Sequence, residues 1–425
     1  MKRRKFIKAG GLATAAAVLP SSVFGENAPS KQITFGFVGV GGMGTANIGR
    51  VLRLRGKGTR ILAVADVDRF HREAAAAKVN KAQGNKDCVA VNDFREITRR
   101  EDIDAIVVST PDNWHALTAL DAIRHNKDVY VEKPLTLTVR EGQVLVEELR
   151  RHERVGQMGT QQRSSKSFRF VAELIRNKRL GKIRKIEVLI PANNKFVGST
   201  WEPQEIPEGF DYDFWLGPAP WAPFHRQRTH YQFRYNLDYA GGQTTNWGAH
   251  YLDIAQWALG MDESGPVEVE GFGIFPQSGL FTAPTRVDFT VRYADGTPMH
   301  VRTRTDGVYD GNIIFHGETG WINVSRSKLV ASDPKLLKTK FGAGDTRLYV
   351  SNNHMGNFLD CVRSRKHPVS DLAIGHRTTT VCNIGNIAML LKRKLRWDPA
   401  KESFVGDAQA NRLLQRSMRA PWRLV

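Results

Sequence analysis

Between residues 32 and 156 the chain alternates short runs rich in Val, Ile and Phe with segments of helical spacing. Strands that alternate with helices form a parallel sheet joined by right-handed crossovers. We therefore predict an α/β domain with a parallel sheet over residues 32–156. The expected strands are 32–40, 60–66, 103–110 and 128–132, and the expected helices are 45–55, 69–81 and 139–152.

The pattern changes after residue 156, where predicted strands follow one another with little helix between them. Ala294-Asp295-Gly296 stands where a hairpin turn belongs. This part predicts an α+β domain with an open, mostly antiparallel sheet over residues 157–370, and residues 371–425 return to the core as helix. The expected strands are 183–191, 267–275, 286–293, 299–304 and 312–316, and the expected helices are 355–363 and 376–393.

A glycine-rich sequence joins the first predicted strand to the first predicted helix. Gly39, Gly41 and Gly44 form a G-x-G-x-x-G pattern that also contains Gly42 and Met43. Such glycines suit a tight turn, the close approach of a diphosphate to the backbone, and the packing of helix on strand. The pattern alone is weak, but its place between a strand and a helix favours a dinucleotide site over a plain turn.

Asp66 closes the second predicted strand and favours NAD over NADP. A carboxylate there accepts hydrogen bonds from the ribose 2′-OH and repels a 2′-phosphate. Arg69 and Arg72 follow it and are able to pair with a phosphate, so NADP stays open. The alternative is an ordinary surface Asp.

Glu132-Lys133-Pro134 ends another predicted strand. The carboxyl ends of parallel strands face the ligand crevice, so Lys133 is placed to point at a substrate. Burial would lower its pKa and let it move a proton. The alternative is an ion pair between Glu132 and Lys133.

Ser109-Thr110-Pro111 ends a strand by the same logic. We predict that these residues and Trp114 frame the dinucleotide. His115 is a cofactor-binding candidate in the same segment, although packing or capping at its helix is favoured over catalysis.

A third cluster spans residues 241–253. Asn246 and His250 are four residues apart, so one helix would place both on one face. His250 has the pKa range for proton transfer with a hydroxyl group, and Asn246 is able to orient it without carrying charge. The alternative is a buried histidine whose hydrogen bonds are satisfied in the core.

Residues 1–25 have the three parts of an export signal: a basic start, an apolar stretch and a small-residue end. The Arg3-Arg4 pair resembles a twin-arginine signal. The apolar stretch is too short to span a bilayer comfortably, so we predict a periplasmic protein with no stable membrane insertion. The alternative is a basic N-terminus on a helix.

The chain has a formal net charge of +19. Such an excess attracts acidic substrates, polysaccharides or membrane surfaces, but its scattered Lys and Arg favour a solvated surface and no nucleic-acid binding. Cys88, Cys361 and Cys382 show neither a disulfide framework nor metal-ligand spacing. We predict no metal site and expect these cysteines to pack in the core.

The glycine loop, Asp66 and the segments 109–111, 132–134 and 241–250 occur in the order found in the Gfo/Idh/MocA oxidoreductases. The chain resembles this family, which includes glucose–fructose oxidoreductase and inositol dehydrogenase, over about residues 32–425. The resemblance implies a Rossmann domain that binds NAD(H) or NADP(H). It also implies a second domain that covers the substrate and forms a homo-oligomer through its sheet.

The resemblance assigns Lys133 to substrate positioning and proton transfer, and His250 to acid–base work on the hydroxyl that is oxidised. Inositol-dehydrogenase-like members have Asp four residues before this His, where this chain has Asn246. A less basic His250 is expected, with Asp253 as a substitute partner. Gln161 lies in a segment that resembles a twin-arginine-exported branch, and we expect it to bind the cofactor.

The first hypothesis for function is hydride transfer between NAD(P) and a sugar, polyol or sugar derivative, with tightly held cofactor because free NAD is scarce outside the cytoplasm. The second is redox-assisted glycoside cleavage, from a branch expected to resemble this chain less; it ranks lower because Glu132-Lys133-Pro134 is intact. The third is a non-catalytic nucleotide-binding sensor, which need not keep Lys133 and His250.

Two loops, at 193–209 and 224–238, are predicted to decide specificity. Within the second, His230 and Tyr231 are hypothesised to line the sugar pocket, because aromatic faces pack against sugar C–H groups.

Overall fold

The computed structural model describes residues 32–193 and 200–425. The predicted export signal at 1–25 lies outside the described residues, as does the segment 194–199 of the first predicted specificity loop. Within the described ranges, no helix is both long and apolar enough to cross a membrane.

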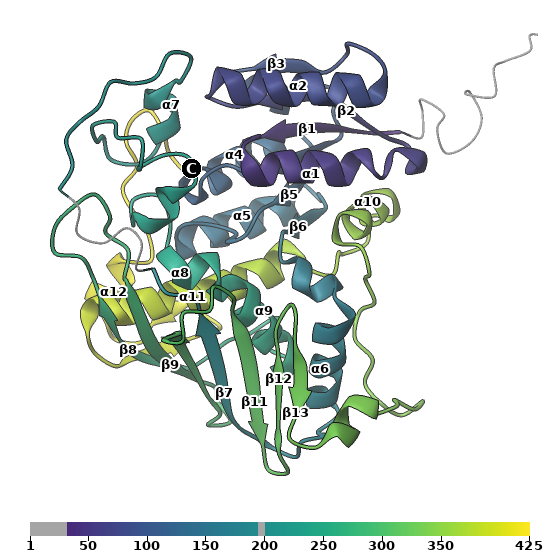
Figure 1. Cartoon of the computed structure of the whole chain (residues 1–425), viewed down its shortest axis with the longest axis vertical. Helices are drawn as coiled ribbons and strands as arrows, with labels where there is room; N and C mark the ends of the chain where they lie inside the picture. Colours follow the sequence, from purple (N-terminus) through teal and green to yellow (C-terminus); the bar gives the residue numbers. More distant parts are fainter. Residues whose placement is uncertain (1–31, 194–199) are drawn as a thin grey trace, which may run out of the picture.

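The N-terminal part is built on a six-stranded parallel sheet with strand order β3-β2-β1-β4-β5-β6. Figure 1 shows this part above the second sheet. The predicted α/β domain is confirmed. The order reverses between β1 and β4, so the crevice for a ligand opens at the carboxyl ends of these strands. The strands are β1 (Ile33–Val38), β2 (Thr59–Ala65), β3 (Val89–Val91), β4 (Ala105–Val108), β5 (Asp128–Val131) and β6 (Gly156–Met158).

Helices cover both faces of this sheet. Apolar residues of α1, α2 and α10 share one hydrophobic cluster with the strands, and those of α4 and α5 share another. α10 falls within the range predicted for the second domain, yet its Phe358 and Leu359 pack under the first sheet. The helices are α1 (Gly42–Leu52), α2 (Arg69–Gln83), α3 (Arg95–Thr98), α4 (Asp112–Arg124), α5 (Val139–Arg151) and α10 (His354–Ser364).

The second sheet has nine strands in the order β13-β12-β11-β7-β10-β9-β8-β14-β15. It is antiparallel except where β10 pairs with β7, which confirms the prediction of a mostly antiparallel sheet. The turn at 294–296 joins β9 to β10, as its sequence predicts. The strands are β7 (Ile183–Ile190), β8 (Glu268–Ile274), β9 (Arg286–Arg292), β10 (Pro298–Thr303), β11 (Asn312–Gly317), β12 (Trp321–Val324), β13 (Leu329–Ala331), β14 (Leu395–Asp398) and β15 (Ser403–Phe404).

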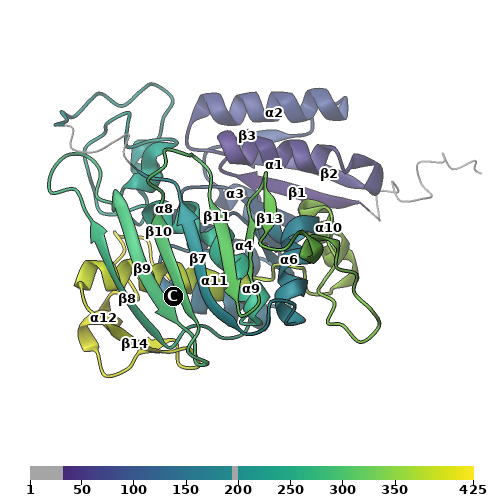
Figure 2. The ribbon, with the colours of Figure 1, turned by 60° about the horizontal axis from the view of Figure 1, so that its bottom comes forward.

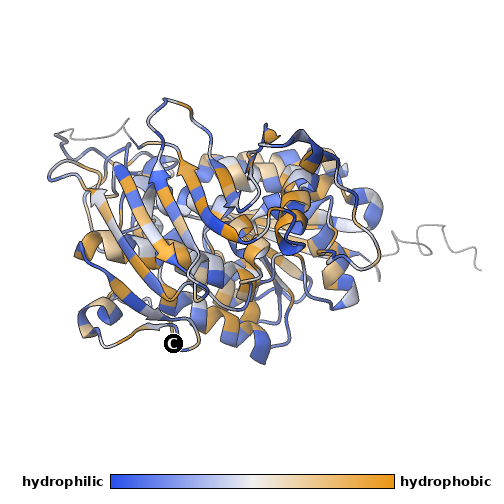
Figure 3. Cartoon of the chain, turned by 90° about the horizontal axis from the view of Figure 1, so that it is seen from below, coloured by the Kyte–Doolittle hydropathy of each residue, from blue (hydrophilic) through white to orange (hydrophobic). Residues whose placement is uncertain are grey.

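Helices α6, α9 and α11 cover one face of the second sheet. In Figure 2 the sheet lies in front of these helices, so its other face is seen. In Figure 3 hydrophobic and hydrophilic residues alternate along these strands, so one set of side chains faces the core. α11 also packs against α5 and thereby joins the two domains. The helices are α6 (Lys166–Arg176), α7 (Tyr212–Leu216), α8 (Gly242–Asn246), α9 (Gly248–Leu259), α11 (Leu372–Leu391) and α12 (Ala408–Arg412).

Candidate active site

A cavity of about 570 Å³ opens at the carboxyl ends of β1, β4 and β5. One end is lined by the glycine loop and Asp66, and the other by Lys133 and Asn246. The second domain contributes the wall that contains His230 and Arg234. The sheet edge predicted from the sequence thus carries the cavity, and both domains line it.

The glycine loop is shaped for backbone contacts with a ligand. Gly39 has φ +77°, and a Cβ on Gly44 would lie 1.9 Å from the Gly39 carbonyl oxygen, so both positions require glycine. A Cβ on Gly41 would meet no heavy atom closer than 3.7 Å, and one on Gly42 would meet none within 4 Å. Both residues line the cavity with Met43, so side chains there would fill space that the dinucleotide's diphosphate needs.

Asp66 lies where β2 ends and is held by the backbone. Its Oδ2 accepts a hydrogen bond from Val40 N at 2.7 Å, and its Oδ1 accepts one from Asp68 N at 2.9 Å. Burial outweighs these bonds and raises the pKa of Asp66. The carboxylate still lines the cavity and fits the role of a ribose-hydroxyl acceptor.

The two arginines after Asp66 already have partners. Arg69 forms a 2.9 Å ion pair with Glu208, and Arg72 donates to the Asp66 carbonyl oxygen and to Asn92. A 2′-phosphate would have to replace these contacts, so the residues present fit NAD better than NADP.

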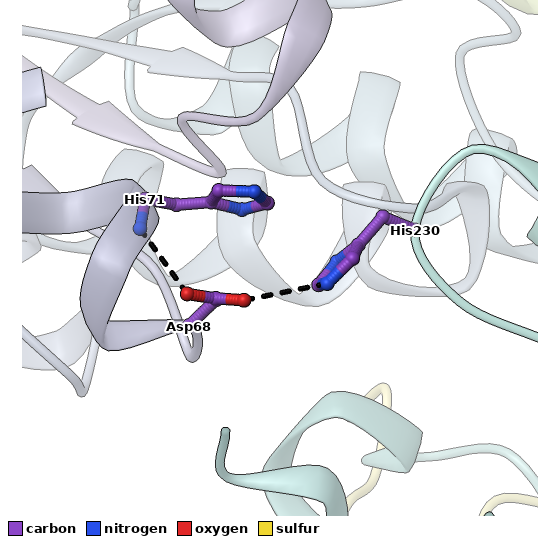
Figure 4. Close-up of side chains that lie close together, drawn as sticks. All are labelled: Asp68, His71 and His230. Atoms are coloured by element: carbon purple, nitrogen blue, oxygen red, sulfur yellow. Dashed lines mark hydrogen bonds and ion pairs between the residues drawn. The ribbon is translucent and has the colours of Figure 1, made fainter. Parts of the chain in front are cut away.

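Asp68, His71 and His230 lie close together near Asp66, and the two histidines line the cavity. Figure 4 shows the three side chains. His230 Nε2 lies 3.3 Å from Asp68 Oδ2, and the two imidazole rings are 4.7 Å apart. Burial, aided by the charge of His71, lowers the pKa of His230. His230 was predicted to line the sugar pocket; it stands instead at the Asp66 end, where it links the second domain to α2. The ligand atoms of Asp68, His71 and His230 also lie close enough together to hold a metal ion.

Lys133 is fixed at the opposite end of the cavity. Its Nζ donates hydrogen bonds to the Asn246 carbonyl oxygen at 2.8 Å and to Asn246 Oδ1 at 2.9 Å. Burial lowers the pKa of Lys133 to about 8, as its sequence position predicts. Glu132 accepts hydrogen bonds from the Asn47 side chain and from the backbone N–H of Lys133, and its carboxylate forms no ion pair with the Lys133 ammonium group among the described residues.

Asn246 and His250 do not share one helix, so that prediction is wrong. α8 ends at Asn246, Trp247 joins the two helices, and α9 begins at Gly248. Asn246 therefore orients Lys133 rather than His250, and its own amide donates to Gln243.

His250 lies behind the lining of the cavity and is only 4% exposed. Its Nδ1 is buried without a hydrogen-bond partner among the described residues. Burial, with the charges of Lys133 and Arg326, lowers the pKa of His250 well below its usual value, so the imidazole stays neutral and is a weak base.

Asp253 was expected to substitute as the partner of His250, but the structure pairs it with other residues. Its Oδ2 lies 2.8 Å from Arg163 Nε in a buried ion pair, and its Oδ1 accepts from Thr378. Gln161 opens the 3₁₀ helix that carries Arg163 and is not among the residues that line the cavity. The ion pair ties this segment to α9 of the second domain.

Ser109, Thr110 and Pro111 line the cavity as predicted. Trp114 reaches it too, with Nε1 donating to the Trp215 carbonyl oxygen. Nδ1 of His115 lies 2.7 Å from the Pro134 carbonyl oxygen, and its Nε2 lies 3.0 Å from the Thr110 carbonyl oxygen. Burial lowers the pKa of His115 to about 4. His115 thus packs between two strand ends as a neutral ring.

Three charged residues near Lys133 escaped the sequence reasoning. Asp112, in the first turn of α4, lines the cavity, and burial raises its pKa to about 7. Arg234 lines the cavity within the predicted specificity loop. Arg326 lies in the turn between β12 and β13, where no sequence signal marks it.

Family models agree with this division of the molecule. Residues 33–160 match the NAD-binding Rossmann fold of an oxidoreductase family, and residues 192–424 match its C-terminal alpha/beta domain. Fold and site thus define an NAD-binding oxidoreductase. The chain belongs to the Gfo/Idh/MocA family.

Individual relatives are more distant. An alpha-N-acetylgalactosaminidase of Shewanella oneidensis is 34% identical over 161 residues, which cover 33% of this chain and 35% of the relative. A glycosyl hydrolase family 109 protein of Shewanella sp. is 33% identical over 167 residues, covering 34% of this chain and 36% of its own. The chain therefore matches only about a third of the length of these curated relatives.

Solved structures share the fold over a longer range. The WlbA dehydrogenase of Bordetella pertussis, in complex with NADH and UDP-GlcNAcA, has a TM-score of 0.64 at 18% identity, covering 86% of this chain and 99% of its own. The aldose-aldose oxidoreductase of Caulobacter crescentus, complexed with glycerol, has a TM-score of 0.63 at 16% identity over 86% and 99%. At these identities the likeness establishes the fold alone.

Proposed function

We propose that the protein is an NAD-dependent oxidoreductase that transfers a hydride between the nicotinamide and a carbinol carbon of a sugar, polyol or sugar derivative. The observation that carries this proposal is one cavity with the glycine loop and Asp66 at one end and Lys133 at the other. The solved relatives bound to a sugar nucleotide and to glycerol support the substrate class.

Lys133 is arranged to move the hydroxyl proton. The Lys133 ammonium group is able to donate three hydrogen bonds. Asn246 accepts two of them, which leaves one for the substrate oxygen. Its pKa of about 8 lets the neutral amine accept the proton during oxidation and the ammonium return it during reduction. Bound NAD supplies the hydride acceptor. His250 stays neutral, so we assign the proton to Lys133 and a hydrogen-bonding role to His250.

Tight retention of the cofactor follows if the protein is exported, as we propose from residues 1–25. Freshly purified, folded protein should carry a nucleotide that mass measurement identifies as NAD. A sugar library added to this protein should change the absorbance of bound NADH. A nucleotide-free preparation would contradict tight retention. A preparation that binds NAD but turns over no polyol would favour the sensor hypothesis.

Redox-assisted glycoside cleavage is the second candidate, and the curated relatives named for glycosidase activity favour it. Hydride removal followed by its return would give no net NADH. Release of nitrophenol from nitrophenyl glycosides, with no net change in NADH absorbance, would place this reaction first. A substrate oxidised with accumulation of NADH would exclude it as the main activity.

We also propose a homo-oligomer that forms through the second sheet. The uncovered face carries exposed apolar side chains on β8, with Phe272 55% and Ile274 46% exposed. Light scattering on the purified protein should give a mass above that of the monomer. Phe272→Lys should reduce that mass, whereas an unchanged mass would place the interface elsewhere.

A further inference from the structure

We propose that the substrate sugar carries an anionic oxygen group, a carboxylate or a phosphate, and that Arg234 and Arg326 bind this group. The inference rests on the proposed sugar oxidoreductase and narrows its substrate class. It follows from two guanidinium groups of the second domain: that of Arg234 lines the cavity, and that of Arg326 lies over the ring of Trp247, the residue after Asn246.

Arg234 reaches the cavity from the 3₁₀ helix Gln232–Tyr235. Its guanidinium carbon lies 3.7 Å from the centroid of the Tyr231 ring and 4.8 Å from that of Phe233. It also donates to the Tyr231 carbonyl oxygen. These contacts hold the guanidinium group in place but leave its charge without a carboxylate.

Arg326 approaches from the turn after β12. Its guanidinium carbon lies 4.9 Å from the centroid of the Trp247 ring, and Trp247 directly follows the residue that holds Lys133. Asn246 lines the cavity, so Arg326 lies next to the cavity wall through Trp247, although it is not itself among the lining residues. Its charge also lowers the pKa of Lys133 and of His250.

These cations lack close acidic partners. Within residues 32–193 and 200–425, neither Arg234 nor Arg326 forms an ion pair, whereas the buried Arg163 has two carboxylate partners. The acids that act on Lys133 are Glu132 and Asp112, and burial raises the pKa of both. A planar carboxylate or a phosphate matches the fork of a guanidinium group and would neutralise this region.

Aromatic rings contact both guanidinium groups, Tyr231 that of Arg234 and Trp247 that of Arg326. The Trp247 and Tyr309 rings are in edge-to-face contact, with centroids 5.8 Å apart, and Tyr231 lines the cavity. Aromatic faces next to guanidinium groups suit a ligand with an apolar ring face and a charged substituent. The two features together favour an acidic sugar over a neutral one.

The test compares matched sugars on the NAD-loaded full chain. Glucose and galactose are each paired with their uronates, and glucose 6-phosphate separates phosphate from carboxylate. We expect kcat/KM for one anionic class to exceed that for its neutral parent by about 10- to 100-fold, the range of a hydrogen-bonded charge. Raising the salt concentration should reduce this preference by screening.

Arg234→Gln and Arg326→Gln should each remove most of that preference, because kcat/KM should fall more for the anionic sugar than for its neutral parent. Arg234→Lys, which keeps the charge but loses the fork, should retain part of it. Lys328→Gln and Arg226→Gln remove exposed cations near the two arginines in sequence and should leave the preference unchanged.

Binding to the NADH-loaded protein, followed by tryptophan fluorescence, gives a readout without turnover. Equal binding and equal kcat/KM for neutral and anionic sugars would overturn the proposal and leave the oxidoreductase assignment standing. Loss of NAD retention in Arg234→Gln with an unchanged sugar preference would overturn it too, because the arginine would then serve the cofactor. If no sugar is turned over, the proposed function fails, and the binding comparison alone decides the charge preference.

Discussion

The two ends of the cavity are built in different ways. At the Asp66 end, backbone N–H groups fix the carboxylate, and each nearby arginine has a partner within the first domain or its neighbouring loop. At the Lys133 end, side chains from both domains meet, and burial shifts the pKa of Lys133 and of Asp112 toward neutrality. The first end is ready to bind, whereas the second holds groups able to exchange protons.

The largest effect should come from Lys133, because its ammonium group lines the cavity, is held by Asn246 and is assigned the proton transfer. Lys133→Met should lower kcat by about 10²- to 10⁴-fold, the usual contribution of a general acid or base. Nucleotide retention should stay at the wild-type level, since the glycine loop and Asp66 are unchanged. A fall of less than tenfold would move the proton transfer to another residue and remove the contrast between the two ends.

Gly44 provides the matching test at the binding end. Gly44→Ala would place a Cβ 1.9 Å from the Gly39 carbonyl oxygen, so the loop must shift. We expect a destabilisation of about 1–3 kcal/mol, with loss of bound nucleotide. Gly42→Ala is the control, because its Cβ meets nothing within 4 Å. Thermal unfolding of nucleotide-free protein should show the loss of stability only for Gly44→Ala, because Gly42→Ala would crowd the diphosphate alone. Equal stabilities would mean that the loop yields freely.

The same contrast explains how far the sequence predicts the molecule. Strand and helix positions, the glycine loop and Asp66 follow from local patterns, because glycine conformation and strand ends are set by neighbours in the chain. The Lys133 end depends on distant contacts. Trp247 divides the predicted helix between Asn246 and His250, and no local spacing shows that Asn246 would turn to Lys133 instead.

The pH dependence of oxidation should report the Lys133 end. The amine must be neutral to accept the hydroxyl proton, so kcat should rise with pH through the Lys133 pKa of about 8 and level off above it. Asn246→Asp would add a negative charge beside Nζ and favour the ammonium form. The rising limb of the pH–rate profile should therefore move to higher pH in this variant. An unshifted limb would show that another group controls the rate.

The smallest effect should be on the choice of cofactor. Asp66→Ser removes the carboxylate that repels a 2′-phosphate, but Arg69 and Arg72 stay engaged with Glu208 and Asn92. We expect the preference for NAD over NADP to fall by about tenfold without reversing, since removal of a repulsive charge adds no new phosphate contact. Competition between the two dinucleotides on nucleotide-stripped protein measures this ratio. A reversal of the preference, to NADP over NAD, would mean that Arg69 and Arg72 leave their partners at little cost. The Asp66 end would then not be fixed in advance, and the contrast with the Lys133 end would be lost.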